Sequence, residues 1–202
     1  VHDLITNGTK DEPRRIFCKN DQGDEVTIQM GECIPYGYVG FLKEGYYYPS
    51  HQATDFYHHY KEDIALMAEM GFNVFRFSIC WSRIYPLGDE ETPNEEGLKF
   101  YDKVISELEK HHMEPLITIC HDEMPMHLAL KYGGWSNRKL IEFFDRYART
   151  CFEEFKGLVK YWLTFNEVDS MIRHPYTTGG LVEDRFPGRN FQEVIFLSLI
   201  HI

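Results

Sequence analysis

The sequence predicts an α/β fold, a partial (β/α)8 TIM barrel in which three parallel strands with flanking helices follow an irregular N-terminal segment. Helix-like and strand-like patterns alternate from about residue 52 onward. Polar residues within or directly after the strand-like runs recur at a constant interval, since Arg76 to His121 is 121 − 76 = 45 positions and His121 to Asn166 is 166 − 121 = 45. The successive units share no self-similar residues, so the interval indicates one βα unit each and not a sequence repeat.

The first 50 residues lack helical periodicity and are rich in glycine, proline and polar residues. Within this irregular segment, residues 14–18 and 26–30 are expected to pair as a hairpin across the turn-rich spacer 20–24.

Three amphipathic helices follow, each recognised by apolar residues at helical spacing. The first ends at Gly71, the second begins in the segment 93–97, and the third begins after the Gly133-Gly134 turn. Their apolar stripes are Tyr60, Ile64, Met67 and Ala68; Tyr101, Val104, Ile105 and Leu108; and Leu140, Phe144, Tyr147, Ala148, Cys151 and Phe155.

Three strands alternate with these helices, at residues 72–81, 116–120 and 158–165. The first is a near-continuous apolar run, which predicts a parallel strand buried on both faces. Cys80 and Cys120 end two of the runs and are expected to behave as small buried hydrophobic residues.

The last part of the sequence predicts a loop at residues 173–190, with turns at Gly179-Gly180 and Pro187-Gly188. A final helix is expected to begin near Phe191, with Ile195, Leu199 and Ile202 on its apolar side. The chain ends inside this apolar stripe, and we interpret residues 1–202 as one incomplete domain.

Composition narrows the class of protein. The formal net charge is −11, with 21 basic and 32 acidic residues and no basic cluster, so we expect no nucleic-acid partner. No apolar run approaches the roughly 20 residues that span a bilayer, and no signal peptide is recognisable. Five widely spaced cysteines form no disulfide framework. We therefore expect a soluble cytoplasmic protein with no membrane contact.

An amide and a carboxylic acid, Asn166 and Glu167, follow directly on the third strand. The carboxyl ends of parallel strands are where α/β proteins place their chemistry. A carboxyl group at the edge of an apolar strand is expected to be partly desolvated, which favours its neutral form and suits a general acid. Alternatively, the two residues only cap the next helix.

Three strand-end motifs together resemble glycoside hydrolase family 1, the β-glucosidase and 6-phospho-β-glucosidase family of (β/α)8 barrels. They are Phe75–Ile84, His121–Pro125 with Gly133–Trp135, and Thr164–Glu167. On this resemblance, the similarity is expected to run from about Asp3 to the end of the chain.

The resemblance implies a role for four residues. Glu167 matches the family's general acid/base, and Asn166 the residue that hydrogen-bonds the sugar 2-hydroxyl. His121 matches a sugar-hydroxyl contact at the bottom of the pocket. Arg76 matches the arginine beside the nucleophilic carboxylate. Without the resemblance, Arg76 would be interpreted as a structural ion-pair partner and His121 as a core imidazole.

Other polar residues are expected to take no part in the reaction. His121, Glu123 and His127 lack the spacing of a metal-binding helix, and Pro125 interrupts any helix between them. We therefore expect no metal and no cofactor, and assign Glu123 to the loop or the sheet. Trp81 and Trp135 are assigned to packing.

The substrate that the resemblance implies is a β-glucoside, and several features favour 6-phospho-β-glucosides. These are Glu-Met-Pro at 123–125, the segment 46–51, valine and not proline at 168, and the segment 174–180. The resemblance leaves open a β-glucosidase of unphosphorylated sugars and a non-catalytic sugar-binding remnant. A different barrel hydrolase with an Asn-Glu strand end is a further alternative.

Two departures from the family stand out. Position 122 is aspartate where the family usually has an aromatic residue. The family's Thr-Glu-Asn-Gly motif, which carries the nucleophilic glutamate, does not occur, and neither does the Gln-x-Glu-Gly motif of its first strand. The sequence therefore predicts a fragment that is inactive alone, with an unknown oligomeric state.

Overall fold

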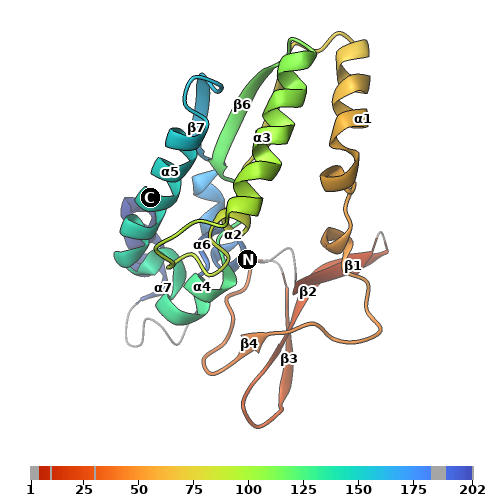
Figure 1. Cartoon of the computed structure of the whole chain (residues 1–202). Coiled ribbons are helices and arrows are strands. Elements are labelled where there is room, and N and C mark those ends of the chain that lie inside the picture. The colour runs from red at the N-terminus through yellow and green to blue at the C-terminus, as the bar shows by residue number, and fades with distance from the viewer. Residues whose placement is uncertain (1–4, 10, 30, 183–189, 202) are drawn as a thin grey trace.

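The computed structural model describes residues 5–182, except 10 and 30, and residues 190–201. Two sheets organise these residues (Figure 1). The first is antiparallel and contains β1 (Thr6–Thr9), β2 (Glu12–Lys19), β3 (Glu25–Gln29) and β4 (Val39–Gly40). The second is parallel, in the order β5 (Val74–Ser78), β6 (Glu114–Cys120) and β7 (Tyr161–Phe165).

The N-terminal segment is more regular than the sequence predicts. The expected hairpin is confirmed, because β2 and β3 pair antiparallel with Cys18 opposite Val26; its last expected position, Met30, lies outside the described residues. The expectation of an irregular segment around it is wrong. Both β1 and β4 also pair with β2, and their short length and turn-rich flanks hide the strand pattern.

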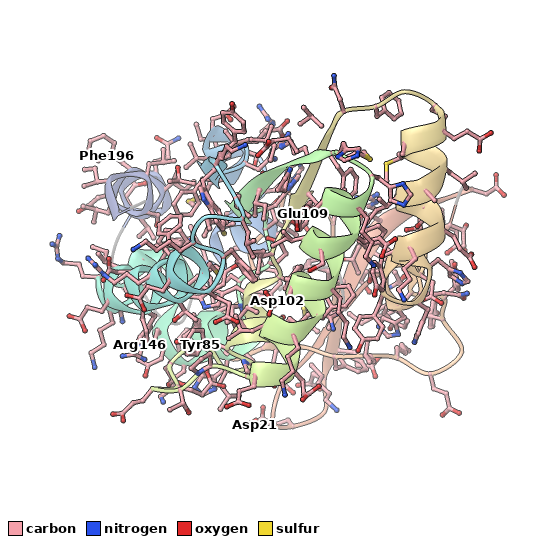
Figure 2. The ribbon with its side chains drawn as sticks, turned by 45° about the horizontal axis from the view of Figure 1, so that its top comes forward. Asp21, Tyr85, Asp102, Glu109, Arg146 and Phe196 are labelled. Atoms are coloured by element: carbon pink, nitrogen blue, oxygen red, sulfur yellow. The ribbon has the colours of Figure 1, made fainter. Side chains whose placement is uncertain are left out.

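Three long helices accompany the parallel strands, as predicted. They are α1 (Phe56–Glu69), α3 (Glu95–Lys110) and α5 (Lys139–Glu154). The side chain of Asn94 caps α3 by accepting a hydrogen bond from the backbone of Glu96, 3.2 Å away. Figure 2 shows the long polar side chains of this helix, with Asp102 and Glu109 at different heights along it.

Short helices occupy segments where the sequence indicated no helix. They are α2 (Trp81–Ile84), α4 (Met126–Tyr132), α6 (Pro175–Gly179) and the 3-10 helices Pro49–His51, Gly134–Ser136 and Val168–Ile172. The expectation of a loop over 173–190 is therefore wrong at α6; residues 183–189, with the expected Pro187-Gly188 turn, lie outside the described residues. The final helix is α7 (Phe191–His201); Ile202 of its expected stripe lies outside the described residues.

The main hydrophobic core lies between the parallel strands and α3 and α5. Trp81 and Trp135 are both buried there, which confirms their packing role. Trp81 stacks on Tyr147, with ring centroids 5.2 Å apart. The Tyr147 hydroxyl lies within hydrogen-bond distance of the backbone oxygens of Ile79 and Ile119, at 2.8 and 2.9 Å, and shares its one proton between them, so it holds α5 near the ends of two strands.

A second, smaller core joins the antiparallel sheet to the short helices. Ile16 and Cys18 of β2 pack there with Ala129 of α4 and Tyr176 of α6. The antiparallel sheet therefore packs against the short helices in the lower part of the molecule (Figure 1). The residues between β4 and β5 connect the antiparallel sheet to the parallel sheet.

The burial predicted for the first parallel strand is wrong. Alternate residues of β5 are exposed, and Phe72 and Val74 are 53% and 49% exposed. In the described sheet β5 and β7 are the outer strands, so only the central strand β6 has neighbours on both sides. Cys120 on β6 is buried as expected, whereas Cys80 is half-buried.

Candidate active site

The carboxyl ends of the three parallel strands are brought to one edge by the register of the sheet. Ser78 lies opposite Thr118, and Cys120 lies opposite Phe165. The backbone N–H of Asn166 donates to the oxygen of Cys120 at 3.0 Å, so the pairing continues one residue past β7. Residues that follow these strands are therefore held near one another.

Arg76 connects all three strands. From β5, its Nε donates to Thr118 Oγ1 on β6 at 3.2 Å, and its Nη2 donates to Asn166 Oδ1 after β7 at 2.7 Å. The guanidinium thus crosses the central strand. Because the amide oxygen of Asn166 accepts this bond, its Nδ2 group is the one left to donate to a ligand.

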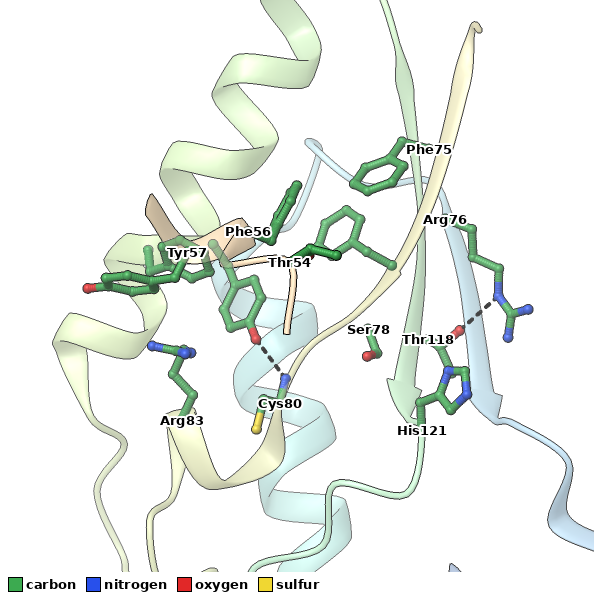
Figure 3. Close-up of a pocket in the computed structure, with 13 residues that line it drawn as sticks. Thr54, Phe56, Tyr57, Phe75, Arg76, Ser78, Cys80, Arg83, Thr118 and His121 are labelled. Atoms are coloured by element: carbon green, nitrogen blue, oxygen red, sulfur yellow. Dashed lines mark hydrogen bonds between the residues drawn. The ribbon is translucent and has the colours of Figure 1, made fainter. Parts of the chain in front are cut away.

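A cavity of about 540 Å³ opens beside the outer strand β5, between it and the starts of α1 and α3, and also touches the ends of β5 and β6. Figure 3 shows Arg76, Thr118 and His121 gathered near the end of β6, with Phe75 turned to the other side of its strand. Arg76 and His121 thus line one cavity, whereas Asn166, although bonded to Arg76, and Glu167 are not among its lining residues. The lining residues are Thr54, Phe56, Tyr57, Phe75, Arg76, Phe77, Ser78, Cys80, Arg83, Phe100, Tyr101, Thr118 and His121.

Glu167 follows Asn166 in a left-handed backbone conformation, with φ 37°. It occupies the N-cap position of the 3-10 helix Val168–Ile172, but its side chain makes no capping hydrogen bond. Capping therefore does not account for a carboxylate at this position. The expected desolvation of Glu167 is wrong for the described structure, because this residue is exposed at the end of the outer strand β7.

The desolvated carboxyl group of this edge belongs to Glu123. Burial raises its pKa to about 8, against the opposing effect of hydrogen bonds from Ser78 and from the backbone of His121. Asp122, which lies between His121 and Glu123 in the chain, has φ 66°. Aspartate tolerates this left-handed conformation better than an aromatic residue does. The assignment of Glu123 to the loop gave no indication of this environment.

No group of histidine, cysteine, aspartate and glutamate suited to a metal ion occurs among the described residues. His127 instead approaches Asp89, with its Nε2 3.0 Å from Oδ2. Asp89 also accepts from Lys131 and Tyr132 at 2.7 and 2.9 Å. These hydrogen bonds lower the pKa of Asp89 although its burial acts in the opposite direction, so this cluster fastens the loop before α3 onto α4.

Thr118 is a site residue that sequence reasoning missed. It is fully buried on β6 and holds the Arg76 guanidinium through its hydroxyl. Its position two residues before Cys120, on an otherwise apolar strand, was the available signal, since alternate residues of a strand share a face.

In the part of the chain that the structure describes, no helix is long and apolar enough to cross a membrane.

Comparison with known proteins identifies the family. Residues 42–201 match the model of glycosyl hydrolase family 1. The match does not include the first 41 residues, so the expectation that the similarity begins near Asp3 is wrong for this family model. The chain is similar to the 6-phospho-beta-glucosidase AscB of Escherichia coli (strain K12), with 59% identity over 79% of this chain and 33% of the relative. It is also similar to the aryl-phospho-beta-D-glucosidase BglH of Bacillus subtilis (strain 168), with 61% identity over 75% of this chain and 32% of the relative.

Solved structures agree with this comparison. The family 1 β-glucosidase from Thermotoga maritima matches with a TM-score of 0.62 and 36% identity, over 73% of this chain and 32% of that one. The fold prediction of a partial barrel is thereby confirmed. The chain spans about a third of the length of the curated relatives it matches. On the extent of the family match, the chain belongs to glycosyl hydrolase family 1.

Proposed function

We propose that this chain supplies the acid/base part of an enzyme that hydrolyses 6-phospho-β-glucosides with retention of configuration. The observation that carries the proposal is the hydrogen-bonded pair of Arg76 and Asn166, next to an exposed Glu167, at the aligned ends of parallel strands. This arrangement presents a cation, an amide donor and a proton donor from one edge of the sheet, as glycoside hydrolysis requires.

Each residue has a distinct part in the proposal. Glu167 protonates the departing glycosidic oxygen and then activates the water that hydrolyses the glycosyl-enzyme. Asn166 donates from Nδ2 to the sugar 2-hydroxyl, a contact that strengthens in the transition state. His121 binds a second sugar hydroxyl, and Arg76 keeps the nucleophilic carboxylate ionised and aligned. Neither a metal nor a cofactor takes part in this chemistry.

Retaining hydrolysis needs a second carboxylate about 5–5.5 Å from the acid/base. In the family, the nucleophilic glutamate belongs to a motif that these 202 residues do not contain. We therefore propose that the chain is inactive alone, and that the nucleophile comes from the part of the family fold that lies outside the third matched here.

The phosphorylated substrate is supported by AscB and BglH, whose names state phospho-β-glucosides. A phosphorylated sugar carries charge and does not cross a bilayer unaided, so we place the enzyme in the cytoplasm. Unphosphorylated β-glucosides are the second candidate, because beta-glucosidase 1 of Arabidopsis thaliana is 48% identical over 140 residues and the Thermotoga structure is a β-glucosidase.

A chimera tests the proposal. Residues 42–182 replace the matching segment of AscB, and hydrolysis of an aryl 6-phospho-β-glucoside is measured. We expect kcat/KM within about tenfold of AscB, because the segment would supply a complete acid/base side. A folded chimera that binds the substrate without hydrolysing it would favour the non-catalytic sugar-binding remnant. The same segment can also replace the matching part of the Thermotoga β-glucosidase. Higher activity of that chimera on an unphosphorylated aryl β-glucoside than of the AscB chimera on the phosphorylated one would favour unphosphorylated substrates.

A further inference from the structure

Glu123 lies where two strand ends meet the cavity. One carboxyl oxygen, Oε1, is hydrogen-bonded to the hydroxyl of Ser78, the last residue of β5. The other oxygen, Oε2, accepts the backbone N–H of His121, the first residue after β6. A single side chain therefore joins β5 to the residue that presents an imidazole to the cavity.

The backbone around Glu123 is shaped for this contact. Asp122 adopts the left-handed conformation, which turns the chain so that the carboxyl group of Glu123 reaches back to the N–H two residues earlier. The following residues, Met124 and Pro125, are buried and anchor the far end of the turn. The side chain of His121 is itself exposed, so its placement depends on how its backbone is held.

We propose that Glu123 is a positioning residue, whose carboxyl group fixes the backbone of His121 against Ser78 and so sets the place of the imidazole in the sugar-binding cavity. The carboxyl group touches neither substrate nor reacting atoms in this role. The proposal rests on the function proposed above for His121, but the contact itself does not depend on hydrolysis.

The titratable side chains from α3, α5 and β6 that face Glu123 do not change their charge in the pH range in which Glu123 does. They are Tyr101 from α3, Tyr147 from α5 and Cys120 from β6, with Asp122 and His121 adjacent in the chain. Burial raises the pKa of the two tyrosines and of Cys120, so these three stay neutral while Glu123 titrates.

The contact is tested by NMR on the 202-residue chain labelled with ¹⁵N-histidine, with the His121 signal assigned by its loss in His121→Gln. We expect the His121 amide proton to shift with a midpoint near pH 8 and to lose this step in Glu123→Gln. Ser78→Ala, which keeps the His121 bond, should move the midpoint without abolishing the step. An amide shift that is the same in the wild type and in Glu123→Gln would overturn the proposal.

The effect on the sugar site is measured in the AscB chimera. Glu123→Gln keeps a neutral group of the same shape and should hold KM within about twofold, whereas Glu123→Ala should raise KM about tenfold with a smaller change in kcat. Unchanged KM in a folded Glu123→Ala chimera would also overturn the proposal. An inactive chimera combined with the expected NMR step would refute the proposed function and leave the Glu123 contact standing.

Discussion

Replacing Glu167 by glutamine in the AscB chimera should lower kcat/KM by about 10²–10⁴-fold for a 6-phospho-β-glucoside whose leaving group needs protonation. Glutamine has the size of glutamate but no proton to give to the glycosidic oxygen. An aryl substrate with a strongly acidic leaving group departs without that proton, so its glycosylation step should be much less affected. The measurement is kcat/KM for the two substrates in each protein.

A matched control is Glu109→Gln, which makes the same change on the exposed side of α3 (Figure 2). It should leave both kcat/KM values within about twofold of the parent chimera, in keeping with a neutral surface substitution. Equal losses for the two substrates in Glu167→Gln would argue that residue 167 holds the structure and does not transfer a proton.

The free energy of unfolding of the 202-residue chain should fall as pH rises from 5 to 7.5, with Glu123 as a major cause. The pKa of Glu123 is about 8 in the folded chain against an ordinary value of 4.5, so the folded state keeps a proton that the unfolded state releases. Stability then decreases by about 1.4 kcal/mol per pH unit in this window, about 3 kcal/mol in total. Urea unfolding at the two pH values measures it.

Glu123→Gln should remove most of this pH dependence, because glutamine does not titrate. The comparison of the two proteins isolates Glu123 from other groups. Asp89 has a lowered pKa, so its contribution is fully present above its ordinary value of 3.8 and constant over this range. An identical loss of stability between pH 5 and 7.5 in both proteins would contradict the assignment of a neutral, half-buried acid at position 123.

The long helices and the order of the strands could be predicted because they follow from local patterns. The stripe from Leu140 to Phe155 needs a helix wherever the rest of the chain lies, and Gly71 ends α1 with a left-handed φ of 86°. The equal spacing of Arg76, His121 and Asn166 indicated one βα unit for each interval, and the parallel pairing of the three strands agrees.

Burial and ionisation could not be predicted from the same patterns, because they depend on which neighbours cover each residue. The apolar run at β5 indicates a covered strand, yet its outer position leaves Val74 exposed. Likewise, sequence reasoning placed the desolvated acid at Glu167. It is Glu123 that is desolvated, because the left-handed turn at Asp122 folds its carboxyl group back against Ser78.

The most direct measurement of the central claim, that Glu167 is the acid/base of a sugar cavity, is azide rescue of the Glu167→Ala chimera. A small anion can enter the space left by the carboxylate and attack the glycosyl-enzyme, which no longer has a base to activate water. With an activated aryl 6-phospho-β-glucoside, added azide should raise the turnover of this variant at least tenfold and release 6-phospho-β-glucosyl azide. Turnover that azide does not change, or hydrolysis at the rate of the parent chimera, would contradict the account.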